Sequence, residues 1–126
     1  MRLEVVAACI EQDGRFLLCR RPAGKNCGGM WEFAGGKIEP GETGEQALVR
    51  ECREELGVEL SVGRMLAETV HTYPACTVHL MLYAAQIRGG TLTIYEHTEA
   101  RWVNFAQAEQ MALCPADRAL LAQIMK

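Results

Sequence analysis

The chain has 126 residues, of which 16 are acidic and 13 basic, and its formal net charge is −3. This length predicts one domain spanning residues 1–126, because two domains would each fall below the usual domain size. The acidic balance argues against a DNA- or RNA-binding protein, which normally has a basic face, and no apolar run approaches the ~20 residues of a membrane-spanning helix.

The N-terminal residues predict a β-hairpin. Residues 3–10 and 16–20 are apolar runs, and Asp13-Gly14 lies between them. An Asp-Gly pair between two apolar segments is typical of a tight hairpin turn. We therefore expect a strand at each apolar run.

Two polar segments around a short apolar one follow the hairpin. Residues 21–30 are rich in turn formers and predict a loop. The apolar segment 31–33 comes next, and Gly35-Gly36 then leads into a second polar loop that ends at Gly41. Taken alone, the two glycines are typical of a turn.

The clearest helix begins near Thr43 and ends near Gly57. Thr43 and Gln46 have the spacing of a capping box, and Gly57 suits the left-handed conformation that ends many helices. On a helical wheel the apolar side chains share one face, which we expect to be buried. They are Leu48, Val49, Cys52 and Leu56.

The C-terminal half predicts strands and a last helix. We expect strands at 64–72, 77–87 and 99–105, with Gly89-Gly90 turning between two of them. Pro115 suits the first turn of a helix. Apolar residues then recur at helical spacing: Leu120, Leu121, Ile124 and Met125. Strands on both sides of a helix predict an α/β or α+β fold in which helices pack on a mixed sheet.

Three glutamates of the central helix fall within an arc of about 100° beside its apolar face: Glu51, Glu54 and Glu55. Like charges at this spacing repel one another, and Glu55 lies at the edge of the apolar stripe, where an unpaired carboxylate is costly. One interpretation is a solvated face whose charge is offset by Arg50 and Arg53. The other is a site for Mg²⁺, which prefers oxygen ligands.

The spacing around this helix resembles the Nudix box. Five residues separate Gly36 from Glu42, and seven more precede the sequence Arg50-Glu51-Cys52-Arg53-Glu54-Glu55-Leu56-Gly57-Val58. Cys52 stands where the family usually has an aliphatic residue, but it lies on the apolar face of the helix. A chance match over so many specified positions is very improbable.

The resemblance continues outside the box. Trp31-Glu32-Phe33-Ala34-Gly35-Gly36-Lys37 is similar to the approach strand of MutT-type Nudix hydrolases, with Ala34 in place of a common proline. Further segments fit the same branch, in which the pattern is most similar to bacterial CTP pyrophosphohydrolases. These segments are EVVAACI at 4–10, Arg20-Arg21-Pro22, Glu96-His97 and Pro115-Ala116-Asp117. The resemblance implies an α/β/α sandwich with a mixed β-sheet between helices.

The same resemblance implies a metal site and catalytic residues. Mg²⁺, or Mn²⁺ in its place, would bind Glu51, Glu54, Glu55 and the backbone carbonyl of Gly35. Glu51 and Glu54 would then also be catalytic. Two further residues complete the catalytic set. Arg50 would hold a glutamate of the box in position, and Glu96 matches a downstream glutamate that related enzymes use as metal ligand or base. Glu51 and Glu96 both remain candidates for the general base.

The expected substrate contacts come from three segments. The guanidinium group of Arg21 suits phosphate oxygens, and Asp117 begins the last helix, where related enzymes hydrogen-bond the nucleobase. The approach strand supplies the others: Glu32, Phe33, Ala34 and Gly35. The alternative for Arg21 is an exposed solubilising residue, and for Asp117 a favourable interaction with the helix dipole.

Asp117 leaves the base preference open. An ionised carboxylate only accepts hydrogen bonds, so it would pair with the two adjacent N–H donors of guanine or 8-oxoguanine. Cytosine presents one amino donor beside an acceptor, and pairing with it needs a protonated Asp117. The chemistry of a carboxylate favours guanine, whereas the overall resemblance favours cytosine.

The implied activity is hydrolysis of a ribo- or deoxyribonucleoside triphosphate to the monophosphate and pyrophosphate, by a water that a glutamate deprotonates. CTP or dCTP analogues and 8-oxo-dGTP are the candidate substrates, and the role would be sanitation of the nucleotide pool. The alternatives are a Nudix hydrolase of ADP-ribose or dinucleoside polyphosphates and a catalytically silent nucleotide-binding module. We expect no nucleic-acid polymer or membrane as partner, and a monomer or homodimer.

The cysteines and histidines show no metal-ligand spacing. The six cysteines are irregularly placed with no CxxC motif, which argues against structural zinc and favours reduced thiols in the cytoplasm. His71, His79 and His97 are expected to be structural or surface residues.

Overall fold

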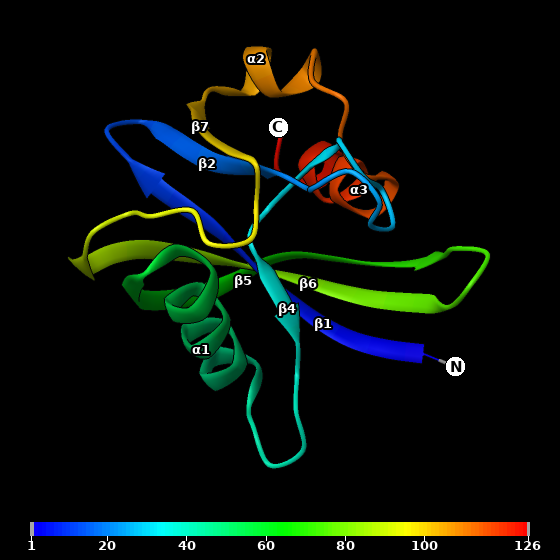
Figure 1. Cartoon of the computed structure of the whole chain (residues 1–126), viewed down its shortest axis with the longest axis horizontal. Helices are drawn as coiled ribbons and strands as arrows, with labels where there is room; N and C mark the ends of the chain where they lie inside the picture. Colours follow the sequence, from blue (N-terminus) through cyan, green and yellow to red (C-terminus); the bar gives the residue numbers. More distant parts are fainter. Residues whose placement is uncertain (1, 126) are drawn as a thin grey trace.

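The computed structural model describes residues 2–125 as a twisted sheet with helices on its two sides (Figure 1). The elements, in chain order, are β1 (Arg2–Gln12), β2 (Arg15–Arg20), β3 (Trp31–Glu32), β4 (Gly35–Lys37), α1 (Gly44–Leu56), β5 (Val58–Thr72), β6 (Thr77–Gly90), β7 (Glu99–Val103), α2 (Phe105–Glu109) and α3 (Pro115–Ile124). No helix within these residues is long and apolar enough to cross a membrane.

Strand β1 is the centre of a seven-stranded mixed sheet. One of its edges runs parallel to β6, from the pair Arg2↔Thr77 to Ile10↔Ala85. The other edge pairs antiparallel with β4 and then with β2. Strand β5 continues the sheet beyond β6, while β3 and β7 both pair with β2. Because β1 is surrounded, its sequence is an almost continuous apolar run.

The side chains of β1 alternate between two hydrophobic cores, as the period of a strand requires. Val6, Ala8 and Ile10 pack in the core under α1, and Ala7 and Cys9 pack in the core under α3. The apolar face predicted for α1 is buried in the first of these cores through Leu48, Cys52 and Leu56, with Ala47 beside them, whereas Val49 is only half-buried and lies outside this core. The predicted α/β sandwich with a mixed sheet between helices is therefore confirmed (Figure 1).

The predictions that depended on local backbone chemistry are confirmed. Asp13 and Gly14 have φ angles of 53° and 76°, as a tight hairpin turn requires, and join β1 to β2. Thr43 and Gln46 form both hydrogen bonds of a capping box. Gly57 ends α1 with φ 67°, and its N–H donates to the carbonyl of Arg53 at 3.0 Å.

The predicted turn at Gly89-Gly90 was wrong, and the alternative of a plain turn at Gly35-Gly36 was wrong as well. Gly35-Gly36 lies within β4, where its partners are Ala7 and Val6 of β1. Gly89-Gly90 closes β6 and pairs with residues 58–59 of β5 instead of turning between two strands. The reason lies in tertiary contacts. Glycine has no side chain whose pattern could predict a strand, and it occurs here because another backbone approaches closely.

Two predicted strand boundaries also moved. β5 begins at Val58, directly after the C-cap of α1, and not at residue 64. The predicted strand 99–105 ends at Val103, because Asn104 forms a capping box with Gln107 and starts α2. Burial of Val58 and Leu60 against α1 explains the early start of β5.

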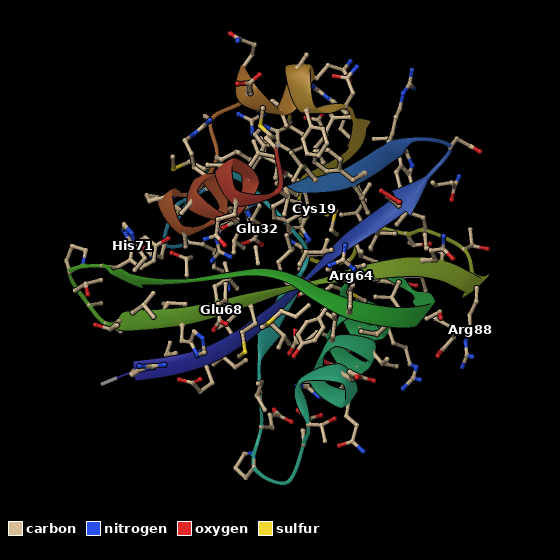
Figure 2. All side chains as sticks on the ribbon, turned by 180° about the vertical axis from the view of Figure 1, so that it is seen from behind. Cys19, Glu32, Arg64, Glu68, His71 and Arg88 are labelled. Carbon is tan, nitrogen blue, oxygen red and sulfur yellow. The ribbon has the colours of Figure 1, made fainter. Side chains whose placement is uncertain are left out.

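A histidine joins three strands on one face of the sheet. The ring nitrogens of His79 on β6 lie 2.7 Å from Glu4 of β1 and 2.7 Å from Glu68 of β5. Figure 2 shows Glu68 and His71 on the half of β5 near the β5–β6 turn, with Arg64 further along the strand. Hydrogen bonds to both carboxylates raise the pKa of His79, so the protonated ring, which donates from both nitrogens, fits this place.

Candidate active site

Two adjoining cavities open where β1, β4, α1 and the start of α3 meet. The larger has a volume of about 420 Å³ and the smaller about 320 Å³. They share Arg21, Glu32, Gly35 and Glu55 as lining residues. Glu51, Phe33 and Asp117 line the larger cavity and Glu96 the smaller. The structure thus brings together candidates that are up to 96 residues apart in the sequence.

Arg50 organises the carboxylates on the α1 side. Its Nε and Nη2 donate to the two oxygens of Glu42 at 2.7 and 2.9 Å, and its Nη1 donates to Glu51 at 2.8 Å and Glu54 at 3.2 Å. Nη2 also donates to the backbone carbonyl of Lys37 at 3.1 Å. These anionic partners raise the pKa of Arg50. The arginine therefore fixes Glu51 and ties the loop before α1 to the helix.

The two glycines of β4 are required by close contacts. A Cβ atom on Gly36 would lie 2.4 Å from Cδ and Oε2 of Glu51, and one on Gly35 would lie 2.0 Å from the carbonyl oxygen of Val6. Such distances are impossible for a side chain. Glycine at these positions lets β4 lie against β1 and lets the carboxylate of Glu51 lie against β4.

Glu55 is a buried carboxylate with an unsatisfied oxygen. It is 8% exposed, and its Oε1 has no hydrogen-bond partner among the described residues. Burial, and then the neighbouring carboxylates Glu51, Glu32 and Glu96, raise the pKa of Glu55 to about 9. Burying such a group without a counter-charge is costly, so its place here calls for a ligand.

A divalent cation fits the residues around Glu55. Glu51 and Glu55 offer hard oxygen donors, and the glycines of β4 leave the backbone beside them accessible, which suits Mg²⁺. Glu54 has a different place: its side chain is 60% exposed, it pairs with Arg50, and it lines neither cavity. Glu96 is exposed beside Glu55 in the smaller cavity and has no ion-pair partner within residues 2–125.

Asp117 lies at the wall formed by α3. It is 5% exposed, and its Oδ1 accepts a hydrogen bond from the backbone N–H of Phe33 at 3.0 Å. Burial, followed by the charge of Glu32, raises the pKa of Asp117 well above its ordinary value. Both causes favour the protonated form, which has one donor and one acceptor, while the nearby guanidinium group of Arg21 acts in the opposite direction.

Glu32 is held by two residues from opposite parts of the chain. Its Oε1 accepts from Arg21 Nη1 at 3.0 Å, and its Oε2 lies 2.9 Å from Nε2 of His97, whose side chain is 4% exposed. Arg21 also donates from Nε to the carbonyl of Asn26 at 2.6 Å. Sequence reasoning missed the role of His97, because nothing in its spacing links it to Glu32, 65 residues away.

Ala34 of the approach strand has a structural place. It is 1% exposed and lines neither cavity, and its carbonyl accepts from the N–H of Ala8 at 2.9 Å. Its neighbours Phe33 and Gly35 do line the larger cavity. The predicted contact between Ala34 and a substrate stays a prediction.

Comparisons with known proteins agree on one family. The family model described as NUDIX domain matches residues 5–123. The chain is 46% identical over 123 residues to a CTP pyrophosphohydrolase of Escherichia coli K12, which covers 98% of this chain and 91% of that protein. It is 33% identical over 125 residues to a putative 8-oxo-dGTP diphosphatase 2 of Mycobacterium tuberculosis, covering 97% and 87%. The crystal structure of a MutT NUDIX hydrolase from Burkholderia pseudomallei matches with a TM-score of 0.87 at 28% identity, over 99% of both chains.

The first prediction concerns Gly36. In Gly36→Ala the new methyl group displaces the carboxylate of Glu51, so we expect affinity for Mn²⁺, measured by calorimetric titration, to fall roughly tenfold or more. The matched control is Gly63→Ala on β5, whose Cβ would meet its nearest atom at 3.4 Å. Unchanged Mn²⁺ binding in Gly36→Ala would show that the position of Glu51 does not matter for the metal.

The second prediction concerns pH and Glu55. Its pKa is raised from 4.5 to about 9, so between these values the folded chain holds a proton that the unfolded chain has lost, and stability without metal falls as pH rises. We expect Glu55→Gln in EDTA to melt several degrees above the wild type near pH 8 and to converge with it near pH 5. Mg²⁺ should raise the melting temperature of the wild type more than that of the variant. A wild type that gains stability over this pH range in EDTA would contradict the assignment.

Proposed function

Because the chain belongs to the NUDIX domain family, we propose that it hydrolyses a cytosine nucleoside triphosphate to the monophosphate and pyrophosphate, with residues 1–126 acting as one domain. The observation that carries this proposal is one cavity with two chemically different ends. Glu51 and Glu55 supply carboxyl oxygens at one end, and Asp117, whose pKa is raised, would in its protonated form supply a donor and an acceptor at the other. A nucleotide matches these two ends, because its metal-bound phosphate chain would lie at Glu51 and Glu55 and its base at Asp117.

The carboxylate end would hold Mg²⁺, or Mn²⁺ in its place. Glu51 and Glu55 would bind it with the backbone carbonyl of Gly35, and Glu54 would join them by turning from the solvent side of α1. When bound, the cation neutralises phosphate charge and acts as a Lewis acid. Arg50 acts through Glu51, which it holds at 2.8 Å, and is thus a positioning residue.

We assign Glu96 as the general base. Glu51 has its carboxylate fixed by Arg50, as suits a metal ligand. Glu96 instead lies exposed at the smaller cavity, with no cation paired to it among the described residues. A carboxylate in such a place is able to take a proton from water and release it to solvent.

The phosphate chain would meet two positively charged side chains. Arg21 lines both cavities, and Lys37 lines the larger one beside Glu51. Arg21 is already oriented by Glu32 and by the carbonyl of Asn26. A guanidinium group held in this way suits the bidentate geometry of phosphate oxygens, so Arg21 is the phosphate contact in this proposal.

The base end favours cytosine. The N3 atom of cytosine is an acceptor and its amino group a donor, and a neutral carboxyl at Asp117 complements both. An ionised carboxylate would instead match the adjacent N–H donors of guanine. Phe33, whose backbone orients Asp117, lines the cavity and offers an apolar wall for the base. The likeness to a CTP pyrophosphohydrolase supports the same choice.

The cellular role follows from the reaction. Removal of surplus or modified cytosine nucleotides would be a task in nucleotide-pool sanitation, carried out by a monomer or homodimer. All six cysteines lie within residues 2–125 and none forms a disulfide, which supports the cytoplasm as the compartment.

The direct test is a substrate panel. CTP, dCTP, 8-oxo-dGTP, ADP-ribose and diadenosine polyphosphates are compared by kcat/KM with Mg²⁺, and the products are identified by chromatography. We expect the cytosine triphosphates to rank first and to give pyrophosphate. A first rank for 8-oxo-dGTP or ADP-ribose would overturn the assignment of the base.

The third prediction separates the protonation states of Asp117. The side-chain amide of the Asp117→Asn variant keeps a donor, an acceptor and the bond from Phe33, so we expect kcat/KM for CTP to stay within roughly tenfold of the wild type. Asp117→Ala loses these hydrogen bonds, and its KM should rise roughly tenfold or more, for a loss of about 1.5–3 kcal/mol. Equal losses in the two variants would indicate that the ionised form is needed.

The fourth prediction separates base from ligand. Glu96→Gln should lower kcat by roughly 10²-fold or more while the affinity for Mn²⁺ stays unchanged. Glu51→Gln should lower both kcat and the affinity for Mn²⁺. Weakened Mn²⁺ binding in Glu96→Gln would make Glu96 a metal ligand instead.

A further inference from the structure

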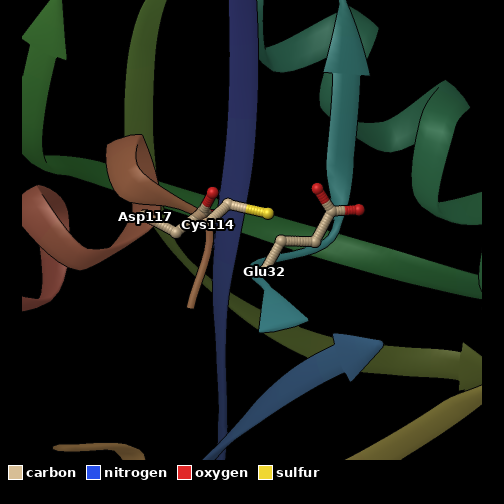
Figure 3. A group of neighbouring side chains, drawn as sticks. All are labelled: Glu32, Cys114 and Asp117. Atoms are coloured by element: carbon tan, nitrogen blue, oxygen red, sulfur yellow. The ribbon is translucent and has the colours of Figure 1, made fainter. Parts of the chain in front are cut away.

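A cluster of mixed donors lies in the wall of the larger cavity, outside the Glu51–Glu55 pair. Glu32 comes from β3, and Cys114 and Asp117 come from the start of α3 (Figure 3). One donor atom from each residue lies within 4.8 Å of the others. Figure 3 shows the sulfur of Cys114 pointing toward the carboxylate of Glu32, with the carboxyl group of Asp117 beside it. A sulfur and two carboxyl groups thus lie close to one another.

Two of the three donors are buried, and Glu32 is half-buried. Cys114 is 3% exposed and Asp117 is 5% exposed. Cys114 occupies the N-cap of α3 without a capping hydrogen bond from its side chain, and its sulfur lies within hydrogen-bond reach of the side chain of Cys27. Of the two carboxyl oxygens of Asp117, only Oδ1 accepts a hydrogen bond from another described residue, the backbone N–H of Phe33. Burial and neighbouring acidic groups raise the pKa of both side chains, as happens when such groups meet without a cation between them.

The third donor is held in position from outside. Arg21 and His97 each bind a different oxygen of Glu32, at 3.0 and 2.9 Å. Outer partners of this kind orient a ligating carboxylate in many metal sites. The charge of Arg21 also partly neutralises Glu32, so a cation here would have to use an oxygen lone pair that Arg21 and His97 leave free.

We propose that Glu32, Cys114 and Asp117 form a second metal site, selective for a thiophilic divalent cation such as Zn²⁺. A thiolate ligand favours Zn²⁺ over Mg²⁺, which takes oxygen ligands. Three protein ligands leave one tetrahedral position for water. The ion would replace the protons of Cys114 and Asp117 and neutralise the charges that these groups then carry. The chain would thereby separate two metals by ligand chemistry, with Mg²⁺ at Glu51 and Glu55.

The site would compete with the nucleobase. Asp117 cannot ligate a metal and present its proton to cytosine at once, so occupation by Zn²⁺ excludes the base from this wall. This consequence rests on the proposed function, whereas binding of the metal does not. Zinc would then be an inhibitor that acts at the base end and leaves the Mg²⁺ site intact.

Cobalt titration tests the site without using activity. Co²⁺ is added to reduced protein in excess Mg²⁺, so that the oxygen site is already filled, and thiolate-to-cobalt charge-transfer absorption is recorded. We expect the band in the wild type and in the control Cys76→Ser, its loss in Cys114→Ser, and its disappearance when Zn²⁺ is added. Cys76 is partly exposed and lines neither cavity. Serine is favoured at an N-cap, so Cys114→Ser should fold, and circular dichroism checks this.

Absence of the band in the wild type, or its persistence in Cys114→Ser, would overturn the proposal. The second arm measures CTP hydrolysis at saturating Mg²⁺, each variant relative to its own rate without zinc. Zn²⁺ should inhibit the wild type in competition with CTP, and its inhibition constant should rise roughly tenfold or more in Cys114→Ser. If CTP is not hydrolysed at all, the cobalt band still decides the metal site. A band with inhibition independent of CTP would overturn the competition with the base.

Discussion

The guanidinium group of Arg50 is the contact on which the site depends. It binds both oxygens of Glu42, together with Glu51 and Glu54, and so holds the loop before α1 against the helix. The same contacts use every nitrogen of the guanidinium group, so no donor remains for Glu55, which lies one turn after Glu51. Arg50 therefore offsets part of the charge of Glu42, Glu51 and Glu54, whereas Glu55 is buried and its Oε1 has no hydrogen-bond partner among the described residues. Charge that the protein leaves unbalanced in this way favours a divalent cation.

Two buried carboxyl groups in one cavity obtain different chemistry from their neighbours. Glu55 faces other carboxylates, and its Oε1 has no hydrogen-bond partner among the described residues. A divalent metal ion would therefore stabilise this carboxyl group more than a proton does. Asp117 receives the N–H of Phe33 and lies near only one charged carboxylate, Glu32. Its raised pKa favours the protonated form, which both donates and accepts hydrogen bonds. Burial raises the pKa of both, and the neighbouring groups differ: several carboxylates surround Glu55, whereas Asp117 has Glu32 and the N–H of Phe33.

The parts of the structure that sequence predicted are those governed by local physics. The capping box at Thr43, the stop at Gly57 and the turn at Asp13-Gly14 each depend on a few adjacent residues. Helical spacing likewise brought Glu51 and Glu55 together on α1, and the structure places both at the cavity. Contacts between distant segments carry no such signal. The strand at Gly35-Gly36 forms because it pairs with β1, and the hydrogen bond between His97 and Glu32 forms because a loop brings His97 to β3.

The base preference shows how burial changes a conclusion drawn from residue type. Aspartate at position 117 favoured guanine only on the premise that it is ionised, a premise that holds for an exposed side chain. Burial and the adjacent Glu32 raise the pKa of Asp117 and so weaken this premise, which reduces the conflict with the likeness to a CTP pyrophosphohydrolase. Arg21 and His97 hold Glu32 near Asp117. If Asp117 binds the base as proposed, the base preference depends partly on Arg21 and His97, because they hold the carboxylate of Glu32, which raises the pKa of Asp117.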